Sequence, residues 1–420
     1  MTYEEFAAEL MRTRVLSDPW LDGAERFRLS GLVLPAERVA ALATAAEAVG
    51  ALLEEIAEVV WREPALLDDY YHLTPYQKLM WLSARGAWHG IARADLFETE
   101  GGGIACCEVN SDTPSGQAEA VLLNRLLLGE HGPVEDPNTG FRDRFLDMLR
   151  TAHGARPIRR VGIVYPTELT EDLSMIALYR DWLGAAGIDV VLGSPFNLGW
   201  GLGGNLAARG GQLTLLGEPV DLVLRHYKTD WWGERLPVWF DQEPYPEPEA
   251  LHQPLTCLLQ ASERGDVTVV NPFGAVITQN KLSYALCHEE KHRFSPRARD
   301  AIDRYLPETR RFVTLDRARL AAERTAWVLK SDYGCEGAET LVGAFTAEKE
   351  WLDALEMAIP SRWVAQRFFR VAPDGDGTLP NIGVFLVGGT AAAYFTRLAK
   401  GPTSYGAQTA PTYVRPQFEA

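Results

Sequence analysis

The sequence predicts a mixed α+β and α/β fold, with a helical N-terminal region, a Rossmann-like unit in the middle of the chain and another sheet towards the C-terminus. Apolar residues recur at three-to-four spacing over residues 34–61, which is typical of an amphipathic helix. Short apolar strands alternate with a helical pattern from about residue 156 to 275, and strand patterns return after residue 326. At 420 residues the chain is long enough for two or three structural units.

The N-terminal region is predicted to be helical around one pair of strands. Further helical patterns cover residues 76–88 and 117–128. Between them, the triplet Gly101-Gly102-Gly103 separates two stretches of alternating residues, and glycine tolerates the positive φ angles of a tight turn. We therefore expect two strands joined by this turn.

The middle and the last parts of the chain differ in how their strands are connected. The middle part is expected to form a parallel sheet with a helix at 171–186 and strands at 161–165, 188–192, 220–224 and 267–270. The last part is expected to form a mixed or antiparallel sheet, with helices at 281–292 and 316–324 and strands at 326–330, 363–371, 382–387 and 391–397. These changes place units at 1–155, 156–275 and 276–420. The tail after Lys400, rich in Gly, Pro, Thr and Tyr, is expected to cover a site or to be mobile.

The composition excludes several classes of function. A formal net charge of −16 leaves no basic footprint for nucleic acid, and no apolar run is long enough to span a membrane. The N-terminal residues are acidic, unlike a targeting segment. The five cysteines are scattered and form no CxxC pair, which fits reduced thiols and argues against a thiolate zinc site. We expect a cytoplasmic protein with small-molecule partners; the sequence leaves its oligomeric state open.

The most informative stretch places oxygen ligands and a guanidinium on neighbouring strands. Arg93 and Asp95 alternate along one strand, and Glu108 and Asn110 alternate along the next. Alternate residues of a strand point to the same face, so these four side chains can converge on one point. Carboxylate and amide oxygens suit Mg²⁺ with phosphates completing its shell, and an arginine suits phosphate or a developing oxyanion.

A second pattern indicates phosphate binding. Lys330 ends a strand and is followed by a loop with Gly334 and Gly337, so that a point charge and close backbone N–H groups can meet a phosphate. A plain strand-to-turn junction is the alternative. Lys281 is either a second phosphate lysine or a lysine at a helix start. Gln366 belongs either to an adenine slot or to an ordinary amphipathic strand.

Two other motifs match by spacing and fail in context. Residues 199–204 match the GxGxxG fingerprint, but the sequence that follows predicts a hairpin where a dinucleotide site needs a helix. His288 and His292 match HExxH, which would place two imidazoles one helical turn apart for zinc. The intervening Glu290 and Lys291 are charged and favour a solvated helix face, so a zinc hydrolase is a distant alternative.

Taken together, these strings resemble the ATP-grasp enzymes, and more closely the circularly permuted synthetase domain of the glutathionylspermidine synthase family. The resemblance runs from about residue 75 to 400 and is carried by Arg93–Asp95, the string from Glu108 to Ser115, Asn271–Gly274, Gln279–Lys281, the Lys330 loop, residues 221–232 and Arg397. The carboxylates precede the lysines, which is the permuted order of this family. It implies a permuted ATP-grasp fold with a Rossmann-like unit before the lysine-containing part. The amidase domain of some members is absent.

The resemblance also implies roles for individual residues. Metal binding falls to Asp95, Glu108 and Asn110, with ATP and Mg²⁺, expected as two ions, as the cofactors. ATP binding falls to Lys281, Lys330, Gly334, Gly337 and Gln366. Arg93 and Arg397 would stabilise the transferred phosphoryl group and the acyl-phosphate, and Ser115 would position the acceptor carboxylate.

The expected function is an ATP-dependent carboxylate–amine ligase that forms an amide bond through an acyl-phosphate. Its substrates would be a small carboxylate or peptide and an amine. The chain has Cys335 where the family usually has arginine, and residues 402–406 replace a family segment, so glutathione and spermidine are not identified as substrates. A non-catalytic ATP-binding regulatory or scaffold protein of the same shape is the alternative.

Overall fold

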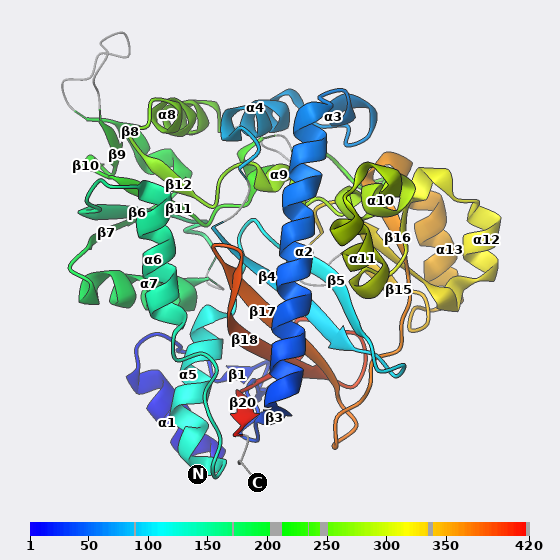
Figure 1. The fold of residues 1–420 in the computed structure, drawn as a ribbon, viewed down its shortest axis with the longest axis horizontal. Coiled ribbons are helices and arrows are strands. Elements are labelled where there is room, and N and C mark those ends of the chain that lie inside the picture. Colours follow the sequence, from blue (N-terminus) through cyan, green and yellow to red (C-terminus); the bar gives the residue numbers. More distant parts are fainter. Residues whose placement is uncertain are drawn as a thin grey trace.

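The centre of the protein is a five-stranded antiparallel sheet, and the long helix α2 (Ala36–Arg62) lies across one of its faces (Figure 1). The computed structural model describes residues 1–87, 90–169, 172–201, 212–233, 235–243, 251–334 and 339–416. In spatial order the strands of the sheet are β19 (Gln408–Ala410), β18 (Thr390–Ala399), β17 (Leu379–Val387), β4 (Ile91–Glu98) and β5 (Ile104–Asn110). Ala94, Leu96 and Val384 share one hydrophobic core with Val49 and Ile56 of α2. Because side chains alternate along a strand, the opposite face is left for polar residues.

Two glycine turns build this sheet. β4 and β5 pair as a hairpin around Gly101-Gly102-Gly103, as the sequence predicts. β17 and β18 are joined by Gly388-Gly389, whose φ angles of 57° and 83° are both positive. Two successive positive φ angles are the geometry of a type I′ turn, which matches the twist of the strands it connects.

A four-stranded parallel sheet stands beside the central one, as expected for the middle of the chain. Its strands, in spatial order, are β12 (Thr268–Val270), β11 (Leu222–Arg225), β6 (Arg160–Val164) and β7 (Asp189–Gly193). The predicted helix after β6 is α7 (Leu173–Ala185). A small antiparallel sheet follows, made of β8 (Leu198–Trp200), β9 (Leu213–Leu215) and β10 (Glu218–Pro219). Gly203 and Gly204 of the GxGxxG match lie outside the described residues.

A third sheet carries the lysine of the glycine loop. Its four antiparallel strands, in spatial order, are β13 (Thr309–Arg311), β16 (Trp363–Arg367), β14 (Trp327–Ser331) and β15 (Thr340–Val342). Helices α12 (Arg317–Ala322) and α13 (Glu348–Met357) accompany it. The strand expected over 363–371 ends at Arg367, and the chain then passes to β4, where the Ala372 N–H donates to the Glu98 carbonyl.

The remaining helices have clear local causes. They are α1 (Tyr3–Arg12), α3 (Leu66–Asp69), α4 (Pro75–Ala84), α5 (Gln117–Leu127), α6 (Phe141–His153), α8 (His252–Glu263), α9 (Ala275–Thr278), α10 (Leu282–Glu289) and α11 (Pro296–Tyr305). Thr74 and Gln77 form a capping box that starts α4. The helix predicted to reach residue 88 ends at Ala84 because Arg85 adopts the left-handed conformation. Within the described ranges, no helix combines the length and apolar character needed to cross a membrane.

The helix predicted over 281–292 is divided in two. α10 ends at Glu289, and Lys291–Arg293 form a separate 3₁₀ turn after the non-helical Glu290. The Glu289 carboxylate accepts hydrogen bonds from the Arg311 backbone N–H at 2.9 Å and from its guanidinium at 2.8 Å. These contacts fix the end of α10 to β13, and the chain turns directly after them.

The first and last described segments of the chain lie side by side (Figure 1). β3 (Leu32–Pro35) pairs in parallel with β20 (Thr412–Arg415). Before it, β1 (Trp20–Leu21) and β2 (Ala24–Glu25) form a short hairpin. The Thr409 carbonyl accepts a hydrogen bond from the Arg28 N–H, and the Thr409 N–H donates to the Arg26 carbonyl. The first and last segments therefore fold as one edge of the molecule.

Candidate active site

One cavity of about 610 Å³ is lined by residues of the two large antiparallel sheets and by loops that follow strands of the parallel sheet. The polar face of the five-stranded sheet, which we call the floor, contributes Arg93, Glu108, Asn110, Phe395 and Arg397. Loops after the parallel strands β6 and β11 supply a second side, and strands β14, β15 and β16 supply a third. The tail after Lys400 borders the same cavity through residues 401–405, 407 and 409, which agrees with the expectation that it covers a site.

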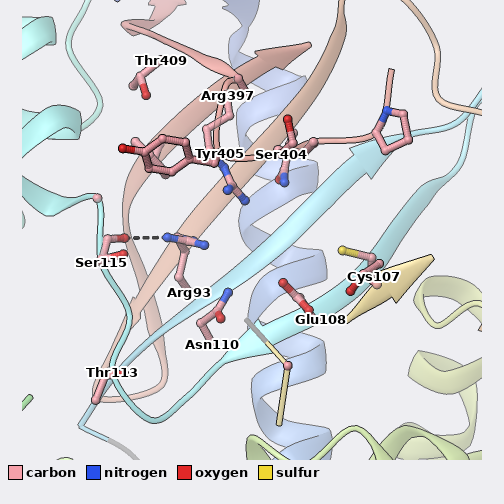
Figure 2. Close-up of a pocket in the computed structure, with 18 of the residues that line it drawn as sticks. Arg93, Cys107, Glu108, Asn110, Thr113, Ser115, Arg397, Ser404, Tyr405 and Thr409 are labelled. Carbon is pink, nitrogen blue, oxygen red and sulfur yellow. Dashed lines mark hydrogen bonds between the residues drawn. The ribbon is translucent and has the colours of Figure 1, made fainter. Parts of the chain in front are cut away.

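The floor brings together the residues that the sequence placed on two alternating strands. In the register of β4 and β5, Arg93 faces Asn110 and Asp95 faces Glu108. Figure 2 shows Arg93, Asn110 and Glu108 in a row, with Arg397 of β18 close to Arg93. The convergence follows from strand pairing, since cross-strand partners on one face lie about 5 Å apart.

Asp95 lies beneath this row and joins both arginines. Its carboxylate accepts hydrogen bonds from Arg93 Nε at 2.7 Å, from Arg93 Nη2 at 3.1 Å and from Arg397 Nη2 at 3.0 Å. Its side chain is 1% exposed. Burial alone would raise the pKa of Asp95, but the Arg93 and Arg397 guanidiniums hold that pKa below its ordinary value. The carboxylate is therefore charged, and it fixes the position of both guanidiniums.

Packing contacts with Phe395 and Gly383 also help to position the two arginines. The Phe395 ring centroid lies 5.3 Å from the guanidinium carbon of Arg93 and 5.9 Å from that of Arg397. A Cβ atom on Gly383 would lie 2.7 Å from Arg93 Cδ, so only glycine leaves room for this side chain. Sequence reasoning missed Gly383 and Phe395, although each alternates with other floor positions along its strand.

The loop after Asn110 is tied to the parallel sheet. Arg225 Nη2 donates to Asp112 Oδ1 at 2.5 Å, and the Thr229 N–H donates to Asp112 Oδ2 at 2.6 Å. The Asn271 side chain bonds the Ile91 backbone and the Asp112 carbonyl. The Ser115 carbonyl accepts from Arg93 Nη1 at 2.6 Å (Figure 2). The loop that carries Ser115 therefore has a fixed place at the cavity wall.

The two lysines lie next to β5, at the edge of the floor. Lys330 Nζ lines the cavity and donates to the Cys107 carbonyl at 3.0 Å. Lys281 Nζ donates to the Gly334 carbonyl at 2.5 Å and lies 3.7 Å from the Glu108 carboxylate, behind the residues that line the cavity. Gly337 and Cys335 lie outside the described residues.

The side of the cavity next to Lys330 is apolar. Gln366 lines it and donates from Nε2 to Thr309 Oγ1 at 3.1 Å. The rings of Phe97 and Phe369 pack here with centroids 5.5 Å apart. Other apolar side chains of this side are Val328, Val342, Phe345, Phe368, Val371 and Leu379. A flat aromatic group that enters between these side chains would meet Lys330 on the way to the floor.

The floor offers a donor set for a hard cation. Glu108 and Asn110 line the cavity, and the Glu108 side chain is 27% exposed. Mg²⁺ in nucleotide sites uses one or two carboxylates together with phosphates and water, and these residues fit that pattern. Within the described residues, no cluster of three His, Cys, Asp or Glu side chains forms a metal site from protein ligands alone. A cation here would need oxygen atoms from a ligand.

Cys107 at the cavity, and the two histidines of the HExxH match outside it, are ruled out as catalytic candidates by their surroundings. Burial raises the pKa of Cys107 to about 12, which keeps this thiol protonated and unreactive at neutral pH. His288 lies on α10, with its Nδ1 3.0 Å from the Tyr284 carbonyl. His292 lies on the next 3₁₀ turn, and its side chain is 76% exposed. Since the helix ends between them, the two imidazoles do not share one helical face, and the HExxH interpretation is wrong.

Two more residues at the cavity escaped sequence reasoning. Asn381 of β17 faces Arg397 in the register, is 3% exposed and has a side-chain oxygen without a hydrogen-bond partner. Arg26, from the N-terminal hairpin, donates to Glu119 at 2.7 Å and to Asp18 at 2.5 Å. Neither belongs to a local motif, because the fold brings each to the cavity from a distant part of the chain.

Comparisons with known proteins give the class of fold. No family model matches the chain, and no curated protein matches it by sequence. The structure is similar to that of a glutathione synthetase-like effector from Globodera pallida in its apo form, with a TM-score of 0.57 and 12% identity over 99% of this chain and 98% of that one. The chain is therefore a mixed α/β protein with a glutathione synthetase-like fold. A protein from Methylobacillus flagellatus, provisionally named a gamma-glutamylcysteine synthetase, gives a TM-score of 0.47 and 13% identity over 91% of this chain and 88% of that one.

Proposed function

We propose that the protein is an ATP-dependent carboxylate–amine ligase that forms an amide bond through an acyl-phosphate. The observation that carries the proposal is the floor, where Arg93, Arg397 and the oxygen atoms of Glu108 and Asn110 border one cavity, with Lys330 next to β5. The glutathione synthetase-like fold supports it. A carboxylate is a poor electrophile, and its activation by phosphoryl transfer needs positive charge and positioning but no covalent nucleophile.

ATP would lie with its base on the apolar side of the cavity and its phosphates over the floor. Gln366 would border the adenine, and Lys330 with the Gly334–Gly337 loop would bind phosphate. Lys281 would hold that loop through its contact with Gly334 and would also reach phosphate. Mg²⁺, proposed as two ions, would be held by Glu108, Asn110 and Asp95 and would neutralise the phosphates when bound. Asp95 could join that set only as the arginines turn from it towards the ligand.

The carboxylate substrate would attack the terminal phosphate of ATP and release ADP. The amine would then attack the acyl carbon, and inorganic phosphate would leave. Arg93 and Arg397 would stabilise the charge on the transferred group, because both side chains line the cavity together with Glu108 and Asn110. Ser115 would position the acceptor carboxylate beside them, since its loop is fixed at the cavity wall.

Within the ATP-grasp enzymes, we propose a place near the circularly permuted glutathionylspermidine synthase family. The order of the motifs supports this: Arg93, Asp95, Glu108 and Asn110 precede Lys281 and Lys330 along the chain. The proposed units at 1–155, 156–275 and 276–420, with the middle one Rossmann-like, follow the same order. The central sheet joins β4 and β5 of the first unit to β17 and β18 of the third. We propose a cytoplasmic location.

The test is a screen for ADP release in the presence of Mg²⁺, with pooled amino acids, small peptides and polyamines as substrates. We expect ADP release that depends on both an acid and an amine, and its loss in Glu108→Ala. Glu263→Gln, whose side chain is 68% exposed outside the cavity, is the control for a charge change without effect. Amine-dependent ADP release that survives in Glu108→Ala contradicts the metal assignment. ATP binding without turnover over the whole panel favours a regulatory or scaffold protein.

A further inference from the structure

A buried imidazole–carboxylate pair stands at the side of the cavity that the nucleotide assignment leaves free. His226 Nε2 lies 3.0 Å from Asp172 Oδ2, and both residues line the cavity. The His226 side chain is 9% exposed and that of Asp172 is 24% exposed. Among the described residues that line the cavity, His226 is the only histidine. Histidine is the side chain whose ordinary pKa allows it to exchange a proton near neutral pH.

The parallel sheet explains why the two residues meet. β6 and β11 are neighbours in the sheet, so their carboxyl ends lie at the same edge. His226 directly follows β11, and Asp172 precedes α7, the helix that returns from β6. The His226 N–H also donates to the Val164 carbonyl at 2.7 Å. The backbone of each partner is therefore set by the sheet and not by a free loop.

The same edge brings His226 to the loop that carries Ser115. His226, Asp112 and Pro114 together line a small cavity next to the main one. Arg225 and Thr229, on either side of His226 in the chain, both bind the Asp112 carboxylate. The imidazole is thus placed beside the wall where the proposed function puts the carboxylate substrate.

The pairing defines which nitrogen can act as a base. With Nε2–H donating to the carboxylate, neutral His226 keeps Nδ1 as its acceptor nitrogen. Burial alone would raise the pKa of Asp172, but the His226 imidazole holds that pKa below its ordinary value, so the carboxylate is charged at neutral pH. The other charged groups around the pair are Asp112 with Arg225, Lys228 beside Asp230, and Glu119 with Arg26.

We propose that His226 is the general base of the amide-forming step and that Asp172 is its positioning residue; this rests on the proposed ligase function. The amine nitrogen forms a bond to the acyl carbon, and its proton passes to His226 Nδ1. The bond from the acyl carbon to the phosphate oxygen then breaks, and inorganic phosphate leaves with that electron pair. The arginines of the cavity cannot accept the proton, since a guanidinium stays protonated at neutral pH.

The test compares two nucleophiles on the same acyl-phosphate. Hydroxylamine is largely uncharged at neutral pH and traps an acyl-phosphate as a hydroxamate without needing a protein base. With the pooled acids of the ADP screen, we expect His226→Gln to lower amide formation about 100-fold, the scale of general base catalysis, and to leave hydroxamate formation within about threefold of wild type. His292→Gln, an exposed histidine outside the cavity, is the matched control. An equal fall of both products, or no fall of either, overturns the proposal.

A second readout separates catalysis from folding. In Asp172→Asn the imidazole loses its negative partner, so amide formation should fall while hydroxamate formation stays within about threefold of wild type. A merely structural role of Asp172 would lower both products together.

The two proposals fail differently. If wild type makes neither hydroxamate nor amide from any pooled acid, the ligase function is wrong. The pair is then judged by ¹⁵N-histidine NMR of the full chain, with the His226 signals assigned through His226→Gln. An imidazole that carries its proton at Nε2, with an Nε2 signal that moves in Asp172→Asn, supports the pair; an imidazole protonated at Nδ1 overturns it.

Discussion

The floor and the lysine side of the cavity hold their positive charges in different ways. On the floor, Arg93 and Arg397 share one buried carboxylate, that of Asp95, at distances of 2.7 to 3.1 Å. On the lysine side, Lys330 donates to the Cys107 carbonyl, and Lys281 donates to the Gly334 carbonyl but also lies 3.7 Å from the Glu108 carboxylate, so the contrast holds for Lys330. A neutral carbonyl orients an ammonium group without cancelling its charge, whereas a carboxylate cancels part of the charge it orients. We infer that the floor fixes the positions of its arginines, whereas the lysine side keeps its charge available to attract an anion.

The largest expected effect on stability comes from removing the Asp95 carboxylate from the floor. Asp95→Ala leaves the buried guanidinium of Arg93 and the partly buried one of Arg397 without their counter-charge, which should lower the free energy of unfolding by about 3–5 kcal/mol. Urea unfolding without nucleotide or Mg²⁺ measures it. Asp147→Ala, at a site where the side chain is 72% exposed, should change stability by less than about 0.5 kcal/mol. An Asp95→Ala protein as stable as wild type would show that the arginines do not depend on this carboxylate.

Gly383→Ala should disturb the floor more gently. The added Cβ would lie 2.7 Å from Arg93 Cδ, so Arg93 must move, at a cost of about 1–3 kcal/mol for overpacking. We expect the turnover number to fall while the KM for ATP stays unchanged, because ATP affinity depends on the other side of the cavity. Gly375→Ala, where a Cβ meets no atom within 4 Å, is the control. Equal changes in turnover and KM would argue against a specific effect on Arg93.

Lys330→Met tests the lysine side. Methionine has a similar volume, so stability should change by less than about 1.5 kcal/mol. The loss of one charge-assisted contact to phosphate should weaken ATP binding about 10- to 100-fold. Calorimetric titration with a non-hydrolysable ATP analogue and Mg²⁺ gives this value. We infer that Lys330 contributes to ATP binding and little to stability. A Lys330→Met protein that unfolds as readily as Asp95→Ala but binds the analogue normally would contradict this.

The smallest expected effect concerns the pH dependence of stability at the edge of the parallel sheet. There Asp172 is paired with one imidazole, whereas Asp95 on the floor is paired with two guanidiniums. Its folded pKa is depressed, so it contributes stability above the unfolded value of about 3.9, and this contribution is lost as the pH falls through the folded value. The gap in urea midpoint between wild type and Asp172→Asn should therefore be widest near neutral pH and should close below about pH 4. Asp181→Asn, an exposed position on the same helix, is the control. A gap that widens in acid would reverse the sign of this linkage.

Much of the local structure could be predicted from the sequence, because its causes are local. Strand alternation placed Arg93 with Asp95 and Glu108 with Asn110, and the glycine triplet predicted the turn between their strands. The apolar strands of the middle part predicted the parallel sheet. Errors fell at helix ends: α4 stops at Ala84 and α10 at Glu289, where one backbone conformation or one distant carboxylate contact ends a favourable pattern.

The sequence by itself determined which face of each strand is polar and where the turns lie, since both depend on neighbours in the chain. Only the tertiary structure decided that Arg397 meets Asp95 across 302 positions, that Gly383 leaves room for Arg93, and that His226 finds Asp172 at the edge of the parallel sheet. Those contacts follow from the register between distant strands. That register is set by the burial of whole apolar faces against α2 and the neighbouring helices, and no short stretch of sequence contains it.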